Sequence, residues 1–443
     1  MAAEPGSGRR REVGRALACA LLLVGSPLFV AYVWLCCEEY GCAISGPLLD
    51  VALGRGRSPG RLLLDGLPRP TLAGFTVFGV WYASQAALAI ALPGRIGYGA
   101  ITPAGHRPAY RLNGLLAWLV THVLLGLAVF RWRLFPSTIV ADHSGGLLVA
   151  ANAAGLLVAV LAYWKARRFP SRPADRRWSG YAVSDFFMGV ELHPRIGPLD
   201  LKLFHIGRVG MMAWTAVNAS FAARQFQELG YVTSSMILVN LLQLVYVLDF
   251  FAREDWYLRT IDMHHDRFGF YLAWGSMVWI PFMYTLQAAY LARHPVRLSP
   301  AATVGILVLA GAGYAVFLSA NRQRDRFRRS DGSAAVRIWR REATSIPASY
   351  VTADGAVHHT RLLTSGWWGL ARHANYVGDI MMATAVSLTC GFAHALPYFY
   401  AVYLTVLLVH RVYRDERRCR EKYGAAWAVY CAAVPYRIVP GVW

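Results

Sequence analysis

Two segments set charged, amide and aromatic residues beside apolar runs: Ser365–Asp379, SGWWGLARHANYVGD, and Leu396–Gly441, LPYFYAVYLTVLLVHRVYRDERRCREKYGAAWAVYCAAVPYRIVPG. If residues 372–379 are helical, four polar side chains share one face at three- and four-residue spacing: Arg372, Asn375, Tyr376 and Asp379. After the apolar run Phe399–Val409, the same spacing returns at Arg411, Asp415, Arg418, Cys419 and Lys422. Two polar helix faces are therefore expected next to hydrophobic helices.

Each of these faces carries Arg or Lys together with a carboxylate. This pattern suits a bound polyanion with a polar body, such as a phosphorylated cofactor. The alternative is a basic segment at the membrane surface that faces lipid headgroups. The aromatic and amide residues among the charges favour the cofactor.

Composition sets the class of protein. Of the 443 residues, 56% are hydrophobic and only 16% are charged, which predicts a polytopic membrane protein and not a soluble globule. The formal net charge is +20, but the basic residues cluster between apolar runs. The positive-inside effect explains that charge without a nucleic acid partner. The seven cysteines form no metal or disulfide framework and are expected to be reduced.

Apolar runs of the length that crosses a bilayer predict the helices. They cover residues 16–37, 71–92, 112–130, 146–164, 209–224, 232–252, 268–290 and 301–319, followed by 378–396 and 396–410. We therefore predict an all-α fold, a polytopic membrane helical bundle of about ten transmembrane helices. Residues 1–15 are expected to be a disordered basic N-terminus. Loops are expected at 41–69, 92–114 and 330–365, and Pro281 is expected to kink its helix.

The apolar run 232–252 carries polar residues at every third position: Asn240, Gln243, Tyr246 and Asp249. Polar groups inside a membrane helix face a bundle interior or water. One explanation is hydrogen bonding between helices, which Asn and Gln commonly provide. The other places Tyr246 and Asp249 at a substrate cavity. The sequence leaves both open.

Two further polar segments have simpler explanations. Residues 181–214 are expected to form an interfacial loop with internal salt bridges. The cluster Asp262, His264, His265 and Asp266 could suggest a metal site. Because no HExxH or paired CxxC motif accompanies it, we predict no metal.

Long motifs resemble the sterol reductase family, which contains the Δ14- and Δ7-sterol reductases and the lamin B receptor. The resemblance covers the two C-terminal segments, TPAGHRPAYRLNG at 102–114 and DFFMGVELHPRIGPLDLKLF at 185–204. His205 and Val209 depart from the family pattern, so His205 is given no role. The run DWYLRTIDMHHDRFGFYLAWGSMVWIPFMYTL at 255–286 is similar to the Δ7-reductases, and ADGAVHH at 353–359 favours the same subgroup.

The resemblance implies an NADPH-dependent oxidoreductase that reduces the 7,8 double bond of 7-dehydrocholesterol-like sterols in sterol biosynthesis. A protein side chain supplies no hydride, so a nicotinamide cofactor is required. The membrane bundle with the sterol pocket is expected at 16–323 and the cofactor-binding half at 324–443. By resemblance the cofactor contacts are Arg324, Arg328, Leu363, Trp368, Asn375, Tyr376, Asp415, Cys419, Arg420, Glu421, Lys422, Tyr423 and Tyr430.

The catalytic acid is expected to be Tyr246, oriented by Asp249. Expected partners are the sterol, membrane lipid and other membrane proteins of sterol biosynthesis, in the endoplasmic reticulum membrane if the source is eukaryotic. Two alternatives remain open at this point. One is a Δ14-sterol reductase, and the other is a non-catalytic sterol-binding scaffold that resembles the lamin B receptor.

Overall fold

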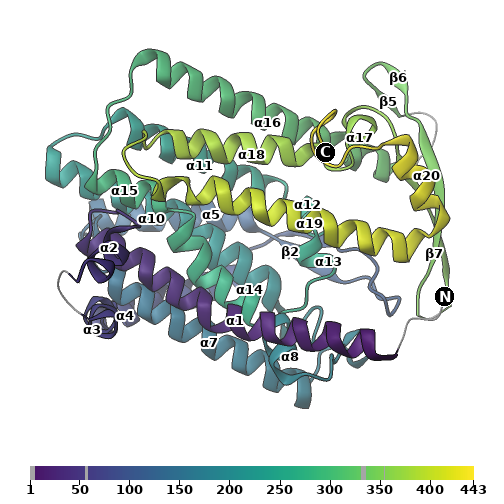
Figure 1. The fold of residues 1–443 in the computed structure, drawn as a ribbon, viewed down its shortest axis with the longest axis horizontal. Coiled ribbons are helices and arrows are strands. Elements are labelled where there is room, and N and C mark those ends of the chain that lie inside the picture. Colours follow the sequence, from purple (N-terminus) through teal and green to yellow (C-terminus); the bar gives the residue numbers. More distant parts are fainter. Residues whose placement is uncertain (1–4, 55–57, 331–335, 354) are drawn as a thin grey trace. The chain divides into compact units, whose positions relative to one another are not determined.

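The computed structural model describes residues 5–54, 58–330, 336–353 and 355–443. The chain forms two compact units. Unit 1 contains Met1–Ala100, Arg107–Val296 and Ala393–Leu396, and unit 2 contains Ile101–His106, Arg297–Phe392 and Pro397–Trp443. Figure 1 shows the elements of both units coloured along the sequence.

Unit 1 is mostly helical. Its N-terminal part contains α1 (Pro5–Glu39), α2 (Gly46–Ala52), α3 (Pro59–Gly66), α4 (Leu72–Ala91), α5 (Gly114–Gly126) with the π-helix η1 (Leu127–Arg131), α6 (Ile139–Asp142), α7 (Ser144–Arg168), η2 (Pro173–Asp175) and α8 (Ala182–Met188). Its second part contains α9 (Leu201–Leu203), the π-helix η3 (Phe204–Met211), α10 (Met212–Leu229), α11 (Ser234–Ala252), α12 (Glu254–Tyr257), α13 (Ile261–His264), α14 (Phe270–Trp274), the π-helix η4 (Gly275–Met283) and α15 (Leu286–Arg293). Two antiparallel hairpins, β1 (Arg95–Tyr98) with β2 (Ala109–Leu112) and β3 (Arg195–Ile196) with β4 (Leu199–Asp200), connect helices.

Close helix packing in unit 1 depends on small residues. Helices α4 and α7 pack together, and Gly74 faces Gly146 across their contact. A Cβ on Gly74 would lie 2.3 Å from the carbonyl carbon of Gly146, so a side chain at this position would push the helices apart.

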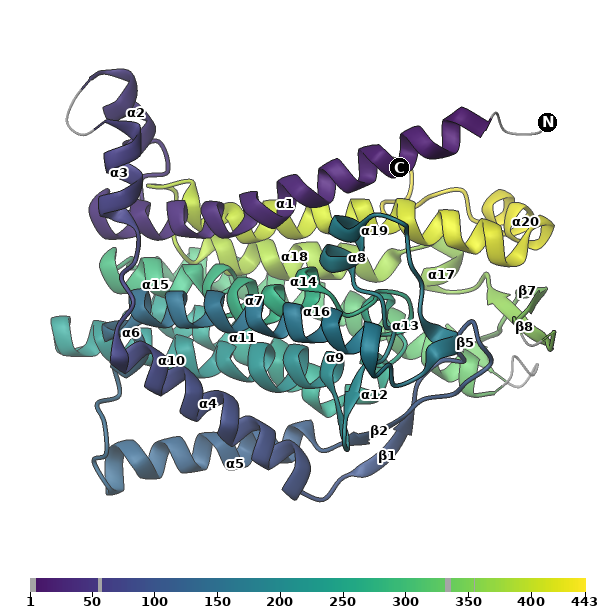
Figure 2. The ribbon, with the colours of Figure 1, turned by 90° about the horizontal axis from the view of Figure 1, so that it is seen from below.

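Unit 2 brings the two polar segments together. It contains α16 (Pro300–Arg329), α17 (Trp367–Leu370), α18 (Ala374–Leu388), α19 (Phe399–Tyr423) and α20 (Ala425–Ala433), with η5 (Leu396–Tyr398) before α19. Two hairpins lie between α16 and α17: β5 (Arg337–Ile338) with β6 (Arg341–Glu342), and β7 (Ser345–Val351) with β8 (Val357–Leu363). Helices α16 and α18 run side by side (Figure 1). Strand β7 packs against α19 and α20, and Figure 2 shows the β7–β8 hairpin at the α20 end of the unit.

The structure confirms a mostly helical, multi-pass membrane fold. Six helices in the described part of the chain are long and apolar enough to cross a membrane: Glu12–Glu39, Leu72–Ala91, Gly114–Arg131, Ser144–Arg168, Ser234–Ala252 and Pro300–Arg329. The other four predicted runs fall on helices that are shorter, broken or more polar. One of these, residues 268–290, changes from α14 to the π-helix η4, which contains Pro281, and continues as α15. The predicted kink therefore takes the form of a π-helix and a break.

Three expected loops contain regular structure, so these predictions were wrong in part. Residues 41–69 contain α2 and α3, and residues 92–114 contain β1 and β2. Residues 330–365 contain β5 to β8, because residues 345–351 and 357–363 pair in register. Helix α1 begins at Pro5, within the segment 1–15 that was expected to be disordered. Residues 1–4, 55–57, 331–335 and 354, on which parts of these predictions fall, lie outside the described residues.

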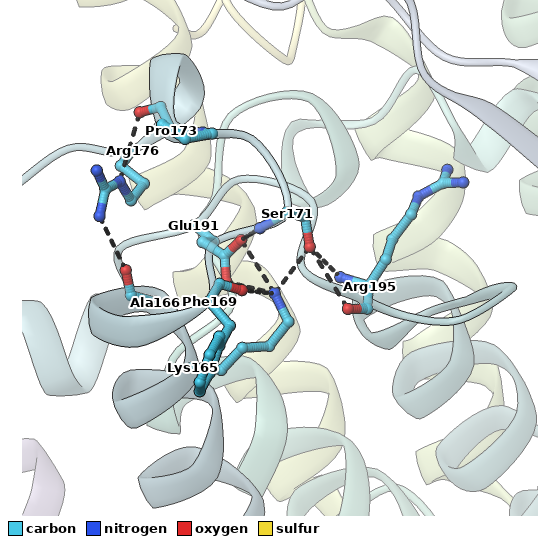
Figure 3. A network of polar contacts seen from close by, with 8 residues as sticks. All are labelled: Lys165, Ala166, Phe169, Ser171, Pro173, Arg176, Glu191 and Arg195. Atoms are coloured by element: carbon cyan, nitrogen blue, oxygen red, sulfur yellow. Dashed lines mark hydrogen bonds and ion pairs between the residues drawn. The ribbon is translucent and has the colours of Figure 1, made fainter.

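The polar segment 181–214 contains an internal ion pair, in which Arg195 Nε lies 3.7 Å from Asp200 Oδ2, and it forms further ion pairs with residues outside it. Lys165 Nζ lies 3.0 Å from Glu191 Oε2, and Ser171 donates its backbone N–H to the same carboxylate (Figure 3). Arg208 Nη2 lies 2.7 Å from Glu254 Oε1, and both side chains are buried. The ion pairs with Lys165 and Glu254 connect the segment to neighbouring helices. They therefore support a structural role for the segment.

Candidate cofactor site

The end of α16 supplies the first cations of the site. Arg324 and Arg328 lie one turn apart near the C-terminal end of α16. The guanidinium carbon of Arg324 lies 4.5 Å from the ring centre of Trp368, and the indole of Trp368 donates a 2.8 Å hydrogen bond to Ala320 O. Trp368 also belongs to a buried cluster with Phe327, Ile338 and Leu363. This packing holds Arg324 over a fixed aromatic ring.

Arg372 has a structural role that local periodicity did not reveal. Helix α18 begins at Ala374, so Arg372 precedes it and does not share its face with Asn375 and Tyr376. Instead, Arg372 Nη2 lies 2.6 Å from Glu416 Oε1 and Nη1 donates to Val434 O at 2.6 Å. This buried ion pair ties the start of α18 to α19 and the C-terminal tail. The predicted common face of residues 372–379 is therefore wrong at Arg372.

Asp415 on α19 lies beside the guanidinium group of Arg418 and the ring of His373. Arg418 Nη2 lies 2.8 Å from Asp415 Oδ1, and His373 Nε2 lies 3.9 Å from Asp415 Oδ2. Burial alone would raise the pKa of Asp415, but the neighbouring charge of Arg418 lowers it below its usual value. The guanidinium groups of Arg324 and Arg328 act in the same direction. Asp415 is therefore an ionised acceptor at neutral pH.

The same face of α19 continues to Lys422 and Tyr423. Cys419 and Tyr430 are buried in a cluster with Trp427 and Val434, and Tyr423 packs against it. Burial raises the pKa of Cys419 and of Tyr430 to about 12, so both are neutral at pH 7. Burial also lowers the pKa of Lys422 to about 8, and the charge of Arg418 adds to this effect. Lys422 thus carries a positive charge at pH 7, and it loses this charge as the pH rises through about 8.

His373 is a site residue that the sequence prediction missed. Its ring stacks on Tyr376, with centroids 5.1 Å apart, and burial lowers its pKa to about 4. The imidazole is therefore neutral and cannot act as a phosphate counterion. Its position inside the quoted SGWWGLARHANYVGD motif was the only available signal.

Three buried polar atoms near the start of α18 and on α19 have no hydrogen-bond partner among the described residues: His373 Nε2, Asn375 Oδ1 and Arg418 Nε. Buried polar atoms in native proteins are normally paired, so atoms of this kind suit a polar ligand. Together with the cations and stacked rings, they fit a phosphorylated cofactor with ribose and amide groups. A dinucleotide offers all of these partners in one molecule.

The remaining predicted contacts differ in their surroundings. Leu363 is buried in the cluster below Trp368. Arg420 and Glu421 are exposed on α19, and Arg420 acts electrostatically on Cys431. Their role in cofactor binding stays a prediction, as does the role of the other eleven predicted contacts.

The proposed catalytic residues lie on α11 in unit 1. Asp249 forms an ion pair with Arg253 one turn later, and the ring of Tyr246 lies 5.7 Å from that of Trp214. Gln243, on the same helix, accepts from Trp214 Nε1 at 2.9 Å and donates to Tyr284 O at 3.0 Å. Gln243 therefore hydrogen bonds between helices, whereas the roles of Tyr246 and Asp249 stay predictions.

The cluster at 262–266 shows structural contacts. Tyr271 donates to Asp266 Oδ2 at 3.2 Å, and the rings of His264 and His265 lie 3.9 Å apart. In the part of the chain that the structure describes, no three His, Cys, Asp or Glu side chains come together in a way that could hold a metal ion.

Known proteins resemble the whole chain. The model of the ergosterol biosynthesis ERG4/ERG24 family matches residues 9–443. A 7-dehydrocholesterol reductase of Xenopus laevis is 46% identical over 95% of this chain and 91% of its own, and one of Danio rerio is 46% identical over 95% and 90%. A Delta(14)-sterol reductase of Methylotuvimicrobium alcaliphilum is 37% identical over 98% and 96%. Because the family model matches nearly the whole chain and these relatives are 37% to 46% identical over at least 95% of it, the chain belongs to the ERG4/ERG24 family of sterol reductases.

Proposed function

We propose that this protein is an NADPH-dependent sterol Δ7-reductase, which reduces the 7,8 double bond of a 7-dehydrocholesterol-like sterol. The observation that carries the proposal is the 46% identity to 7-dehydrocholesterol reductases over 95% of the chain. The side chains of unit 2 support the proposal, because a cation that can bind phosphate, Arg324, lies over Trp368, and Tyr376 stacks on a second ring.

The residues of unit 2 have distinct tasks in this proposal. Arg324, Arg328 and Lys422 neutralise the cofactor phosphates, and the guanidinium groups keep their charge at any physiological pH. Trp368 and Tyr376 offer flat faces to rings. Ionised Asp415 accepts a hydrogen bond from a ribose hydroxyl or an amide. When bound, NADPH supplies the hydride that no side chain can provide.

Reduction of an olefin also requires a proton on the second carbon. Tyr246 is the proposed donor, and Asp249 is proposed to orient it. The reaction then balances, because one carbon receives hydride from the cofactor and the other receives the phenolic proton. The phenolate is afterwards reprotonated from water.

The sterol is apolar, so its pocket is proposed to lie among the membrane helices and to open to lipid. Six helices in the described part of the chain are long and apolar enough to cross a membrane. The proposal extends this to about ten crossings, in the endoplasmic reticulum membrane of a eukaryotic cell. A sterol substrate reaches such a pocket from the bilayer without passing through water.

A Δ14-sterol reductase is the second candidate. The 37% identity to such a protein over 98% of the chain favours it over any unrelated activity. The higher identity to the 7-dehydrocholesterol reductases favours the Δ7 bond. A non-catalytic scaffold remains the third outcome of the test.

The test is a side-by-side assay of the membrane-embedded protein with NADPH and either a Δ7 or a Δ14 sterol. Reduction of the Δ7 sterol alone, lost in Tyr376→Ala and Arg328→Ala, supports the proposal. Reduction of the Δ14 sterol alone overturns the specificity but keeps the cofactor site. Binding of both sterols without reduction of either identifies a scaffold.

A further inference from the structure

The hairpin β7–β8 carries an aromatic residue that contacts the predicted cofactor site. Tyr350 lies on β7, within a segment that sequence reasoning assigned to a loop. The Lys422 Nζ atom lies 3.6 Å from the centre of the Tyr350 ring and 5.3 Å from that of Tyr423. The two tyrosine rings meet edge to face, with centroids 6.1 Å apart. The ammonium group of Lys422 is thus held against two aromatic rings.

The position of Tyr350 is itself fixed by the hairpin. His358 pairs with Tyr350 across the two strands and stacks on its ring at a centroid distance of 5.1 Å. Thr352 donates its hydroxyl proton to Ala356 O, so the hydroxyl oxygen accepts from His358 Nε2 at 3.1 Å. This hydrogen bond orients the imidazole. A fixed imidazole in turn limits the movement of the Tyr350 ring.

The base of the hairpin is anchored to the same helices that carry the site. Ile346 and Leu362 pack against the buried cluster that contains Cys419 and Tyr430. At the other end, Ala353 donates its backbone N–H to Pro103 O at 2.9 Å. The strand therefore presents Tyr350 to α19 from a position that is supported at both ends.

We propose that Tyr350 is a positioning residue that holds the ammonium group of Lys422 in place for a cofactor phosphate. The proposal rests on the assignment of the NADPH site to unit 2. A lysine side chain has four rotatable bonds, and ordering it on binding costs free energy. A cation held over an aromatic face is already ordered, so less entropy is lost when the phosphate binds. The hairpin thus belongs to the cofactor site.

The test compares NADPH dissociation constants, measured by the fluorescence of the bound nicotinamide, for detergent-purified variants. Tyr350→Ala is expected to weaken binding about fivefold, which corresponds to a partly exposed cation–π contact. Tyr350→Phe keeps the ring and should bind like the wild type. Val351→Ala is the matched control, because Val351 is the next residue of the strand and is exposed.

A double-mutant cycle separates positioning from a general loss of structure. If Tyr350 acts through Lys422, Lys422→Ala with Tyr350→Ala binds no more weakly than Lys422→Ala alone. Equal losses in both backgrounds, or an unchanged dissociation constant in Tyr350→Ala, overturn the proposal. If Lys422→Ala itself leaves NADPH binding unchanged, the assignment of the cofactor site fails instead. The two failures are therefore distinguishable.

Discussion

The charge of Arg324 affects several of the proposed cofactor residues in unit 2. Its charge acts on Asp415, Cys419 and Tyr430, which lie on two different helices. Its contact with Trp368 fixes the guanidinium over an aromatic ring. A cation in this position can neutralise phosphate without a large reorganisation of the site.

Arg324→Ala is therefore expected to weaken NADPH binding by about 10- to 100-fold, the range of a charge-assisted hydrogen bond. Arg322→Ala on the same helix is the control, because Arg322 is exposed. Equilibrium binding of NADPH checks both. Equal effects of the two substitutions would show that only the overall positive charge of the helix end matters.

Lys422 is expected to make cofactor binding depend on pH. Burial lowers the pKa of its ammonium group to about 8 in the free protein. Below that pH the group is protonated and attracts phosphate, whereas above it a proton must be taken up when the cofactor binds. The NADPH dissociation constant is thus expected to rise above pH 8 by up to about tenfold per pH unit. Titrations between pH 7 and pH 9.5 measure the slope.

Lys422→Arg is the control for this pH dependence, because a guanidinium keeps its charge throughout the range. Its dissociation constant should stay flat above pH 8, even if the altered geometry weakens binding at every pH. A wild-type profile that is equally flat would show that Lys422 does not contact the phosphate.

At the scale of elements, the contact between α16 and α18 positions the two sides of the site. Gly313 and Gly378 face each other, and a Cβ on Gly313 would lie 2.9 Å from Gly378 O and 2.8 Å from the Cβ of Met381. Arg324 lies three turns beyond Gly313 on α16, and Asn375 lies one turn before Gly378 on α18. A change in this crossing therefore moves the cation away from its polar neighbours.

Gly313→Val is expected to destabilise unit 2 by about 1–3 kcal/mol, the usual cost of inserting atoms into a packed contact. The apparent Tm in detergent should fall, and NADPH binding should weaken with it. Gly311→Val is the matched control, because nothing lies within 4 Å of a Cβ on Gly311. If the Tm of Gly313→Val is unchanged, the contact between α16 and α18 accommodates the added side chain and the prediction is wrong.

Particular elements show what the sequence could predict. Helix α19 was expected from an apolar run followed by polar residues at three- and four-residue spacing, and both features are local. The partner of Arg372 was not predictable, because Glu416 lies 44 residues later in the chain. The hairpin β7–β8 was missed for a similar reason. Its strands mix polar and apolar residues without a long apolar run, and they are stabilised by pairing with each other and by contact of β7 with α19 and α20.

At the scale of the whole molecule, the two groups of proposed reaction residues belong to different units. The proposed cofactor contacts from Arg324 onward lie in unit 2, and the proposed proton donor, Tyr246, lies on α11 in unit 1. Binding of NADPH should therefore be separable from transfer of the proton. An enzyme that binds its cofactor normally but does not reduce its substrate would show this separation directly.

Tyr246→Phe removes only the phenolic hydroxyl, so the ring contact with Trp214 can remain. The expected result is a fall in kcat for the Δ7 sterol of about 100-fold or more, the usual contribution of a general acid. The NADPH dissociation constant should stay within about twofold of the wild type, because an isolated loss of the hydroxyl leaves unit 2 unchanged.

Arg324→Ala supplies the opposite pattern and serves as the reference for this experiment. It should weaken NADPH binding, yet recover much of its turnover at saturating cofactor, because the proton donor is intact. Product analysis by gas chromatography and mass spectrometry measures both variants. If Tyr246→Phe instead turns over normally, the proton comes from another group, and the polar residues of α11 have the interhelical role that Gln243 already shows.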